Sequence, residues 1–405
     1  MKETSYAVRL HGEHVGSLRR RDNFTKFVID RDYWDRPGRP VLGRWFEEHP
    51  RKNQRAVDRV PAWFSNLLPE GRLRELIARG QGVNVHREID LLERIGSDLP
   101  GAVEVGLEAE TMVDRGFDDA VESSPGARPA PGIRRASLAG MTMKFSVRRD
   151  GDRLVMPAHD QDGDWILKTP DSAYPGLPAN EYAVMNLARA VGITVPDTQL
   201  WERGSIDDLG EGAWPSQETL AYAVRRFDRS SAGRVHIEDF AQLLGRFGVG
   251  EGKYRSNVET IAGLAYRGYD DASLQEMVRR TVFNLLIGNN DAHLKNWSLI
   301  YPDRRKAELS PAYDLVCTSV YLPQPEDPHL GLPFLGAKRL SEVRREHFSR
   351  LQDTLEVRGR DVLAVVDDTV ERFADHWADE REALPPEVSR WVEEHLQQTR
   401  AQLRE

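Results

Sequence analysis

The chain has 405 residues, of which 40% are hydrophobic and 30% charged, and its formal net charge is −9. This length predicts two or three units that each bury a core, and the composition is that of an ordinary globular protein. The acidic balance argues against a surface built as a whole to hold nucleic acid, although a basic patch such as Arg19-Arg20-Arg21 leaves local contacts open.

Cys317 is the only cysteine, which excludes an intrachain disulfide and a thiolate metal cage and fits a reducing compartment. The first residues contain no apolar signal-peptide core. No segment approaches the roughly 20 apolar residues of a membrane span. We therefore expect a cytoplasmic protein without a membrane partner.

The first third of the chain predicts a small α+β module over residues 1–110. Apolar and polar side chains alternate between residues 5 and 30, which is typical of a meander of short strands. Apolar residues at helical spacing follow in FSNLLPEGRLRELIARG, where Gly80 marks the end of the helix, and again in REIDLLERIG. The segment SDLPGAVEVGLE then reads as a turn and a strand.

Residues 111–136 differ in composition from the rest of the chain. They include DDAVESSPGARPAPGIRRA, which is rich in Pro, Gly, Ser and charge and lacks periodic apolar residues. This composition predicts a mobile linker.

Two further units follow, at residues 137–230 and 231–405. The first carries the strand-like MKFSVRRD, DWILKTP and TLAYAVRRF around the helical NEYAVMNLARAVG. The second carries the helical HIEDFAQLLG and SLQEMVRRTVFNLLIG, a strand, turn and strand in WSLIYPDRRKAELSPAY, and a charged helical region from about Ser341.

The segment NDAHLKN, directly after the long helix, has the spacing of a catalytic loop. Asp291 and Asn296 lie five positions apart, as do the aspartate that accepts the substrate proton and the metal-binding asparagine of protein kinases. Asp314 follows the predicted hairpin, in the place of the kinase aspartate that binds magnesium.

Upstream segments supply the other parts of a phosphoryl-transfer site in kinase order. SLAGMTMK could cover phosphates with its backbone N–H groups, with Gly140 allowing close approach. Lys168 ends a strand-like run, Glu181 opens the next helix and could orient this lysine, and AVRRFDR stands where a kinase has its adenine-pairing hinge. The collinear order of these segments carries the prediction.

Each of these features also has an ordinary structural interpretation. Asp291 could be a simple loop former, Lys168 a solvated lysine, and Glu181 a first-turn acid favoured by the helix dipole. His293 with two aspartates would also suit a metal-dependent phosphohydrolase, but no second histidine lies at ligand spacing.

The chain resembles the HipA-type serine/threonine kinases, the toxin components of bacterial type II toxin–antitoxin systems. The resemblance covers nearly the whole chain and rests on FSNLLPEGRLRELIARG, IGSDLPGAV, LPANEYAVMNLARAVGI, RRFDR, HIEDFAQLLG, NNDAHLKN and LSPAYDL. It implies an α+β, kinase-like two-lobed fold with a small N-terminal module and an all-helical C-terminal lobe.

The resemblance also implies the roles of particular residues. Asp291 would be the catalytic proton acceptor, and Asn296 and Asp314 would bind Mg²⁺. ATP would be bound by Ala139, Gly140, Met141, Thr142, Met143, Lys144, Lys168, Arg225, Arg226, Phe227, His293, Lys295 and Tyr313.

Ser137 matches the serine whose autophosphorylation, in this family, withdraws the phosphate-covering loop. Nearly two added negative charges would repel a bound triphosphate, and Arg134 and Arg135 offer other partners. The sequence departs from the family pattern at Thr142, where glutamine is frequent, and at Arg225, where an acid is frequent.

The implied function is that of an ATP- and Mg²⁺-dependent kinase that phosphorylates an essential host protein, aminoacyl-tRNA synthetases being the family's best-known targets. The implied partner is a small helix-turn-helix antitoxin of HipB type, through which operator DNA would be contacted indirectly. A kinase-fold co-repressor and a metal-dependent phosphohydrolase are the alternatives.

Overall fold

The computed structural model describes residues 2–50, 52–112, 143–157, 162–210, 212–323, 327–358 and 361–404. The predicted linker at residues 111–136 lies outside this part of the chain apart from its first two residues. Ser137 and the loop residues Ala139, Gly140, Met141 and Thr142 also lie outside it.

The N-terminal module is an antiparallel sheet covered by short helices. The strands are β1 (Lys2–Leu10), β2 (Glu13–Arg21), β3 (Phe24–Ile29), β4 (Arg55–Val57) and β5 (Val103–Met112), in the order β4-β3-β2-β1-β5. The helices are α1 (Arg31–Asp35), α2 (Arg44–Glu48), α3 (Ala62–Ser65), α4 (Gly71–Gly80) and α5 (Glu88–Ile95). The predicted meander is confirmed, because Tyr6, Val8 and Leu10 alternate into the module's core.

A second antiparallel sheet lies next to this module. Its strands are β6 (Lys144–Asp150), β7 (Arg153–Val155), β8 (Trp165–Lys168), β9 (Thr198–Glu202) and β10 (Leu220–Arg225), in the order β7-β6-β8-β10-β9. Helix α6 (Leu177–Val191) packs against β9 and β10. Its apolar face at Ala183, Val184, Leu187, Ala188 and Val191 is buried, as its spacing predicts.

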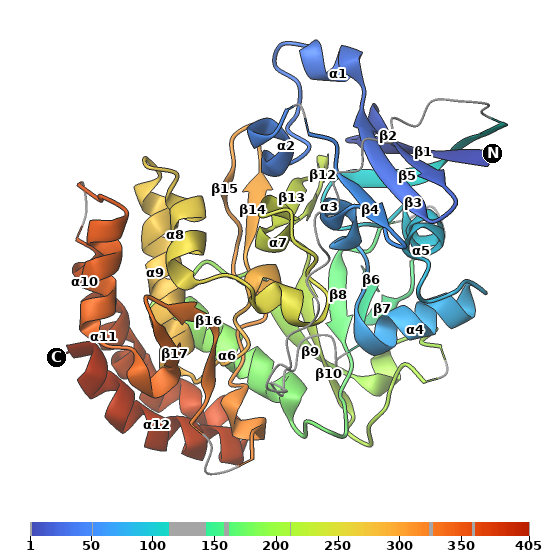
Figure 1. Ribbon diagram of the computed structural model, residues 1–405. Coiled ribbons are helices and arrows are strands. Elements are labelled where there is room, and N and C mark those ends of the chain that lie inside the picture. The colour runs from blue at the N-terminus through green and yellow to red at the C-terminus, as the bar shows by residue number, and fades with distance from the viewer. Residues whose placement is uncertain are drawn as a thin grey trace.

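Helices dominate the C-terminal lobe, the yellow-to-red part of the chain in Figure 1. They are α7 (Phe240–Leu243), α8 (Val258–Tyr266), α9 (Asp271–Leu286), α10 (Arg345–Thr354), α11 (Val362–Glu380) and α12 (Pro386–Arg404), and α9 contacts α8, α11 and α12. Short 3₁₀ turns are η1 (Arg203–Ser205), η2 (Gly250–Tyr254), η3 (Leu294–Asn296), η4 (Ser319–Tyr321), η5 (Leu340–Glu342) and η6 (Arg381–Ala383).

The expectation of an all-helical C-terminal lobe needs one correction. Strand β13 (His236–Asp239) pairs with β14 (Ser298–Tyr301), which pairs with β15 (Glu308–Leu309), and β16 (His329–Phe334) pairs with β17 (Ala337–Arg339). Strands of two to six residues are too short for periodicity to reveal, and β13 is paired with a strand about 60 positions away. The predicted hairpin after the catalytic loop is confirmed as β14 and β15.

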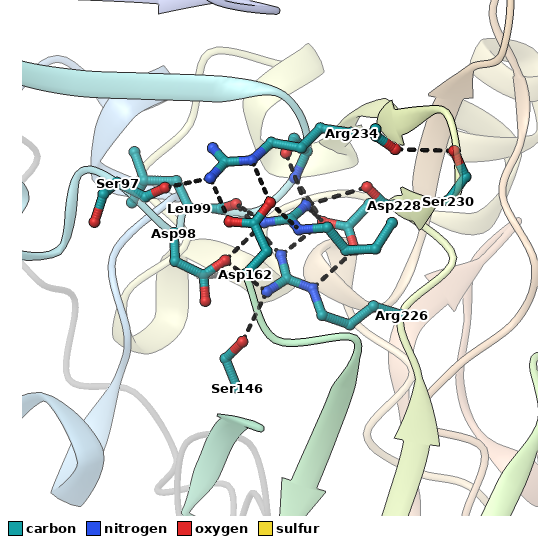
Figure 2. Close-up of polar contacts among 12 residues, drawn as sticks. Ser97, Asp98, Leu99, Ser146, Asp162, Arg226, Asp228, Ser230 and Arg234 are labelled. Carbon is teal, nitrogen blue, oxygen red and sulfur yellow. Dashed lines mark hydrogen bonds and ion pairs between the residues drawn. The ribbon is translucent and has the colours of Figure 1, made fainter. Parts of the chain in front are cut away.

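A cluster of arginine and aspartate side chains joins the N-terminal module to the segment after β10 (Figure 2). Arg226 Nη1 lies 2.8 Å from Asp98 Oδ1, and Arg229 Nη2 lies 2.7 Å from the same oxygen. Both arginines also pair with Asp228, at 2.9 and 2.8 Å. Here β11 (Arg229–Ser230) and β12 (Gly233–Arg234) form a small hairpin, and Arg234 pairs with Asp162.

In this cluster the guanidinium of Arg226 is hydrogen-bonded to protein side chains. Its guanidinium donates to Asp228, Asp98 and, at 3.0 Å, to Ser146 Oγ on β6, so that it holds three segments together. Buried charges remain charged only when they are paired and hydrogen-bonded in this way.

Replacing Asp98 with Asn should lower the free energy of unfolding by about 1–3 kcal/mol at pH 7, since it removes a charged acceptor from two arginines. Burial alone would raise the pKa of Asp98, but Arg226 and Arg229 lower it from 3.8. Its stabilisation is therefore present above that pH and is lost as the pH falls, so the difference between variant and wild type should shrink below about pH 4. Urea unfolding at pH 7 and pH 3 measures this.

Asp207→Asn is the control, because Asp207 pairs with Arg153 on the surface and such pairs add little. A deficit for Asp98→Asn that is equal at both pH values would contradict the ionic role of Asp98.

Candidate active site

A cavity of about 730 Å³ lies where the two sheets and the C-terminal lobe meet. All but one of the expected nucleotide, metal and catalytic residues in the described part of the chain line it: Lys144, Lys168, Arg225, Arg226, Phe227, Asp291, His293, Lys295, Asn296, Tyr313 and Asp314. The exception is Met143, which is buried and instead accepts a backbone hydrogen bond from Thr169.

Lys168 lies at the end of β8 and joins two carboxylates from distant parts of the chain. Its ammonium pairs with Glu181 of α6, as the sequence predicts, and its Nζ lies 2.5 Å from Asp314 Oδ1. Lys144, which lies opposite Lys168 on β6, places its Nζ 2.9 Å from Asp314 Oδ2. The Lys168 ammonium lies over the ring of Tyr222, with Nζ 5.5 Å from the ring centroid.

The two carboxylates around Lys168 differ in their pKa values. Burial alone would raise the pKa of Asp314, but Lys144 and Lys168 hold it well below its usual range. The pKa of Glu181 is raised, because the side chain is fully enclosed and the Asp314 charge lies on the far side of the shared ammonium. Burial opposes the charge on Lys168, yet the two carboxylates raise its pKa, so the lysine stays protonated.

The predicted catalytic loop begins where α9 ends. Gly288 adopts φ +67°, a left-handed conformation, and a Cβ at this position would lie 2.2 Å from the ring of Trp391 on α12. Two asparagines then shape the turn: Asn289 Oδ1 accepts the Asp291 N–H at 3.1 Å, and the Asn290 N–H donates to Thr318 Oγ1 at 2.8 Å. At position 288 only glycine permits both the left-handed backbone and the close contact with Trp391.

Asp291 and Asn296 face each other across the 3₁₀ turn η3. The Asn296 amide donates to the backbone oxygen of Asp291 at 3.0 Å, and Tyr254 OH donates to Asp291 Oδ1 at 2.5 Å. The five-residue spacing therefore closes a small loop that presents both side chains to the cavity.

His293 and Tyr313 line the inner part of the cavity. Burial and the nearby Lys253 lower the pKa of His293 to about 3, so its ring is neutral, and neither ring nitrogen has a hydrogen-bond partner among the described residues. Tyr313 OH donates to the backbone oxygen of Lys295 at 2.9 Å, and its ring lies 5.8 Å from that of Phe227. Arg225, in contrast, is mostly exposed and pairs loosely with Asp197 at 3.6 Å.

The N-terminal module supplies side chains to this cavity that sequence reasoning did not assign to the site. Glu70, in the segment between α3 and α4, lies 2.6 Å from Lys295 Nζ and 3.4 Å from Lys253 Nζ. Asn66 accepts a hydrogen bond from Lys295 through its backbone oxygen. No motif or spacing marks Glu70, because its partners come from about 180 and 225 positions away.

The oxygen donors for a divalent cation are the Asp314 carboxylate and the Asn296 side-chain amide. Mg²⁺ is held in phosphoryl-transfer sites by one or two such protein oxygens together with waters and substrate phosphates. The residues therefore fit this ion. Within the described ranges, no group of three or more His, Cys, Asp and Glu side chains forms a self-sufficient metal cage.

None of the helices in the described part of the chain is both long and apolar enough to cross a membrane.

A lysine–glutamate pair, a catalytic-loop Asp and Asn, and a third acid around one cleft define a kinase-like protein. Comparison with known proteins narrows this class. The family model for the HipA N-terminal domain matches residues 6–106, and that for the HipA-like C-terminal domain matches residues 136–377. The chain therefore belongs to the HipA family.

Individual relatives agree with this placement. Y4dM of Sinorhizobium fredii, named as a candidate kinase, is 39% identical over 95% of this chain and 94% of its own. The serine/threonine-protein kinase toxin HipA of Shewanella oneidensis is 27% identical over 65% of this chain and 64% of its own. The solved complex of Shewanella oneidensis HipA, HipB and operator DNA contains a chain that matches the fold with a TM-score of 0.74, at 20% identity, over 98% of this chain and 97% of its own.

Replacing Gly288 with Ala should destabilise the protein by roughly 2–4 kcal/mol, because a side chain there combines a left-handed backbone with overlap against Trp391. Gly80→Ala is the matched control, since no atom lies within 4 Å of the position that its Cβ would take and its φ is not in the left-handed region. Thermal and urea unfolding of both variants would check this, and equal stability of the two would contradict it.

Proposed function

We propose that the chain is an ATP- and Mg²⁺-dependent serine/threonine protein kinase that acts as the toxin of a HipA/HipB-like toxin–antitoxin system. The observation that carries the proposal is that the carboxylates of Glu181 and Asp314 both pair with the Lys168 ammonium. This ammonium lies in the same cavity as Asp291 and Asn296. A purely structural lysine has no need of two acids and an adjoining catalytic loop.

The proposed chemistry assigns one task to each group. Lys168 and Lys144 would hold phosphate oxygens, with Glu181 keeping Lys168 in place when Asp314 turns to a metal ion. Asp291 would accept the proton of a serine or threonine hydroxyl as the oxygen attacks the γ-phosphorus and the bond to the β-phosphate oxygen breaks. Bound Mg²⁺ would neutralise phosphate charge, with Asn296 and Asp314 as its protein ligands.

Nucleotide binding would change the partner of Lys144. In this structure its ammonium pairs with Asp314, and its side chain is 39% exposed at the cavity edge, so it has room to move. A polyphosphate offers this lysine a stronger partner and releases one oxygen of Asp314. The loop residues 139–142 would cover the same phosphates, and the backbone at Arg225, Arg226 and Phe227 would face the adenine.

The proposed macromolecular partners follow from the relatives. A HipA of Shewanella oneidensis has been solved with HipB and operator DNA, and a HipB-type antitoxin is the proposed partner here. Since this chain is acidic overall, operator contact would come mainly through that antitoxin. The proposed protein substrate is an essential host protein, of the kind represented by aminoacyl-tRNA synthetases.

Replacing Asp291 with Ala should lower ATP-dependent labelling of host proteins by at least roughly 10²-fold, because the proton acceptor is lost. Nucleotide affinity should change little, since Lys168 and the metal ligands stay. Quantitative phosphoproteomics of host cells that express wild type or variant measures the loss and names the substrate. Asp303→Ala, in the exposed hairpin after the loop, is the control and should label like wild type.

Full labelling by Asp291→Ala would exclude the kinase assignment. Release of inorganic phosphate without labelled protein would instead favour the phosphohydrolase alternative. A wild type that binds antitoxin and operator but transfers no phosphate would favour the co-repressor.

Incubation with ATP should place phosphate on Ser137, which lies just before the proposed phosphate-covering loop. Intact-mass measurement and peptide mapping would show one added phosphate there and none in the Asp291→Ala variant. An active kinase whose Ser137 remains unmodified would contradict this regulation.

A further inference from the structure

The N-terminal module reaches the predicted catalytic loop through a partly buried carboxylate and a backbone oxygen. Glu70 follows α3 and its side chain is 18% exposed, while its partners Lys295 and Lys253 are 15% and 4% exposed. The first lysine directly precedes Asn296 and lines the cavity, and the second directly precedes Tyr254, whose hydroxyl bonds Asp291. Glu70 therefore contacts the predicted catalytic loop at Lys295 and, at Lys253, the segment whose Tyr254 bonds Asp291.

The Glu70 contact holds Lys295 at a defined position. Its Nζ is bound by the Glu70 carboxylate and, at 3.2 Å, by the backbone oxygen of Asn66, while its own backbone oxygen accepts from Tyr313 OH. Asn66 itself is anchored to the C-terminal lobe, because its side chain bonds Arg246 O and Gly248 N. Both ends of Lys295 are thus restrained by groups that also line the cavity.

The cluster contains two ammonium groups and one carboxylate that pairs with both, while the charges of Asp239 and Asp291 act on Lys295 and Lys253 respectively. Glu70 balances one of the two lysines, and burial of two ammonium groups without it would bring like charges together in a poorly solvated place. Burial alone would raise the pKa of Glu70, but Lys295 and Lys253 lower it to about 2, so the carboxylate is ionised at neutral pH. The Lys295 ammonium is thereby held at the wall of the cavity that Asp291 and Asn296 also line.

We propose that Glu70 is a positioning residue for phosphoryl transfer, by which the N-terminal module fixes the Lys295 ammonium where negative charge develops on the transferred group. This inference rests on the proposed kinase function. A fixed cation stabilises charge without reorganising during the reaction, so its benefit appears in kcat more than in the binding of ATP. The N-terminal module then contributes to phosphoryl transfer by positioning a residue of the active site.

The test compares Glu70→Gln, Glu70→Asp and wild type for transfer of ³²P from [γ-³²P]ATP with Mg²⁺ into a heat-treated bacterial protein extract. Glu70→Gln should lower kcat roughly 10- to 100-fold while the KM for ATP changes less than about threefold. Glu70→Asp, which keeps the charge but shortens its reach, should recover part of the rate. If Glu70→Gln does not fold, the smaller loss in Glu70→Asp carries the same test.

Partial recovery of kcat in Glu70→Asp separates positioning from a loss of structure, because that variant keeps a carboxylate for the Lys295 ammonium. Glu47→Gln is the matched control: Glu47 pairs with Arg39 in the same module and does not line the cavity. It should leave kcat and the KM for ATP unchanged.

Unchanged or raised kcat in Glu70→Gln, a change in KM alone, or an equal loss in Glu47→Gln would each overturn the proposal. A wild type that transfers no phosphate would overturn the kinase function and this inference with it. An active wild type together with an unchanged kcat in Glu70→Gln would overturn only the inference about Glu70.

Discussion

The arrangement of the site depends on one buried ammonium shared by two carboxylates. Lys168 comes from the second sheet, Glu181 from helix α6 packed against it, and Asp314 from the segment after the β14–β15 hairpin. Separating any of them leaves a charge in a place with little water, which costs several kcal/mol unless it is neutralised. The pairing therefore ties the two lobes together at the point where phosphates are expected to bind.

The N-terminal module is joined to this core at both ends of the cavity. At one end Asp98 forms ion pairs with Arg226 and Arg229, which lie at and just after the predicted hinge. At the other end Glu70 forms ion pairs with Lys295 and Lys253, beside the predicted catalytic loop. Each connection is an ion pair with little exposure to solvent, so it is directional as well as strong. A module held in this way restricts how far the cavity can open.

Much of the site could be predicted because its parts are local in sequence. The five-residue spacing of Asp291 and Asn296 closes a turn of six residues. Lys168 and Glu181 lie thirteen positions apart, so one strand and the helix that follows it are enough to bring them together. Of the short strands in the C-terminal lobe, β13, β16 and β17 were not predicted; β13, for example, pairs with β14 far along the chain. The pairing of the Arg226 side chain with Asp98 of the module was not predicted, because the two residues are 128 positions apart.

By itself, the sequence determined the order of the residue types that form the site: a lysine at a strand end, an acid in the next helix, an Asp–Asn loop and a following aspartate. These are properties of neighbouring residues and of their periodicity. Tertiary structure alone decided that Asp314 shares the ammonium of Lys168, that Trp391 requires glycine at position 288, and that Glu70 reaches Lys295. Such contacts join residues 100 or more positions apart, and the packing of whole elements, rather than any local preference, sets their distances.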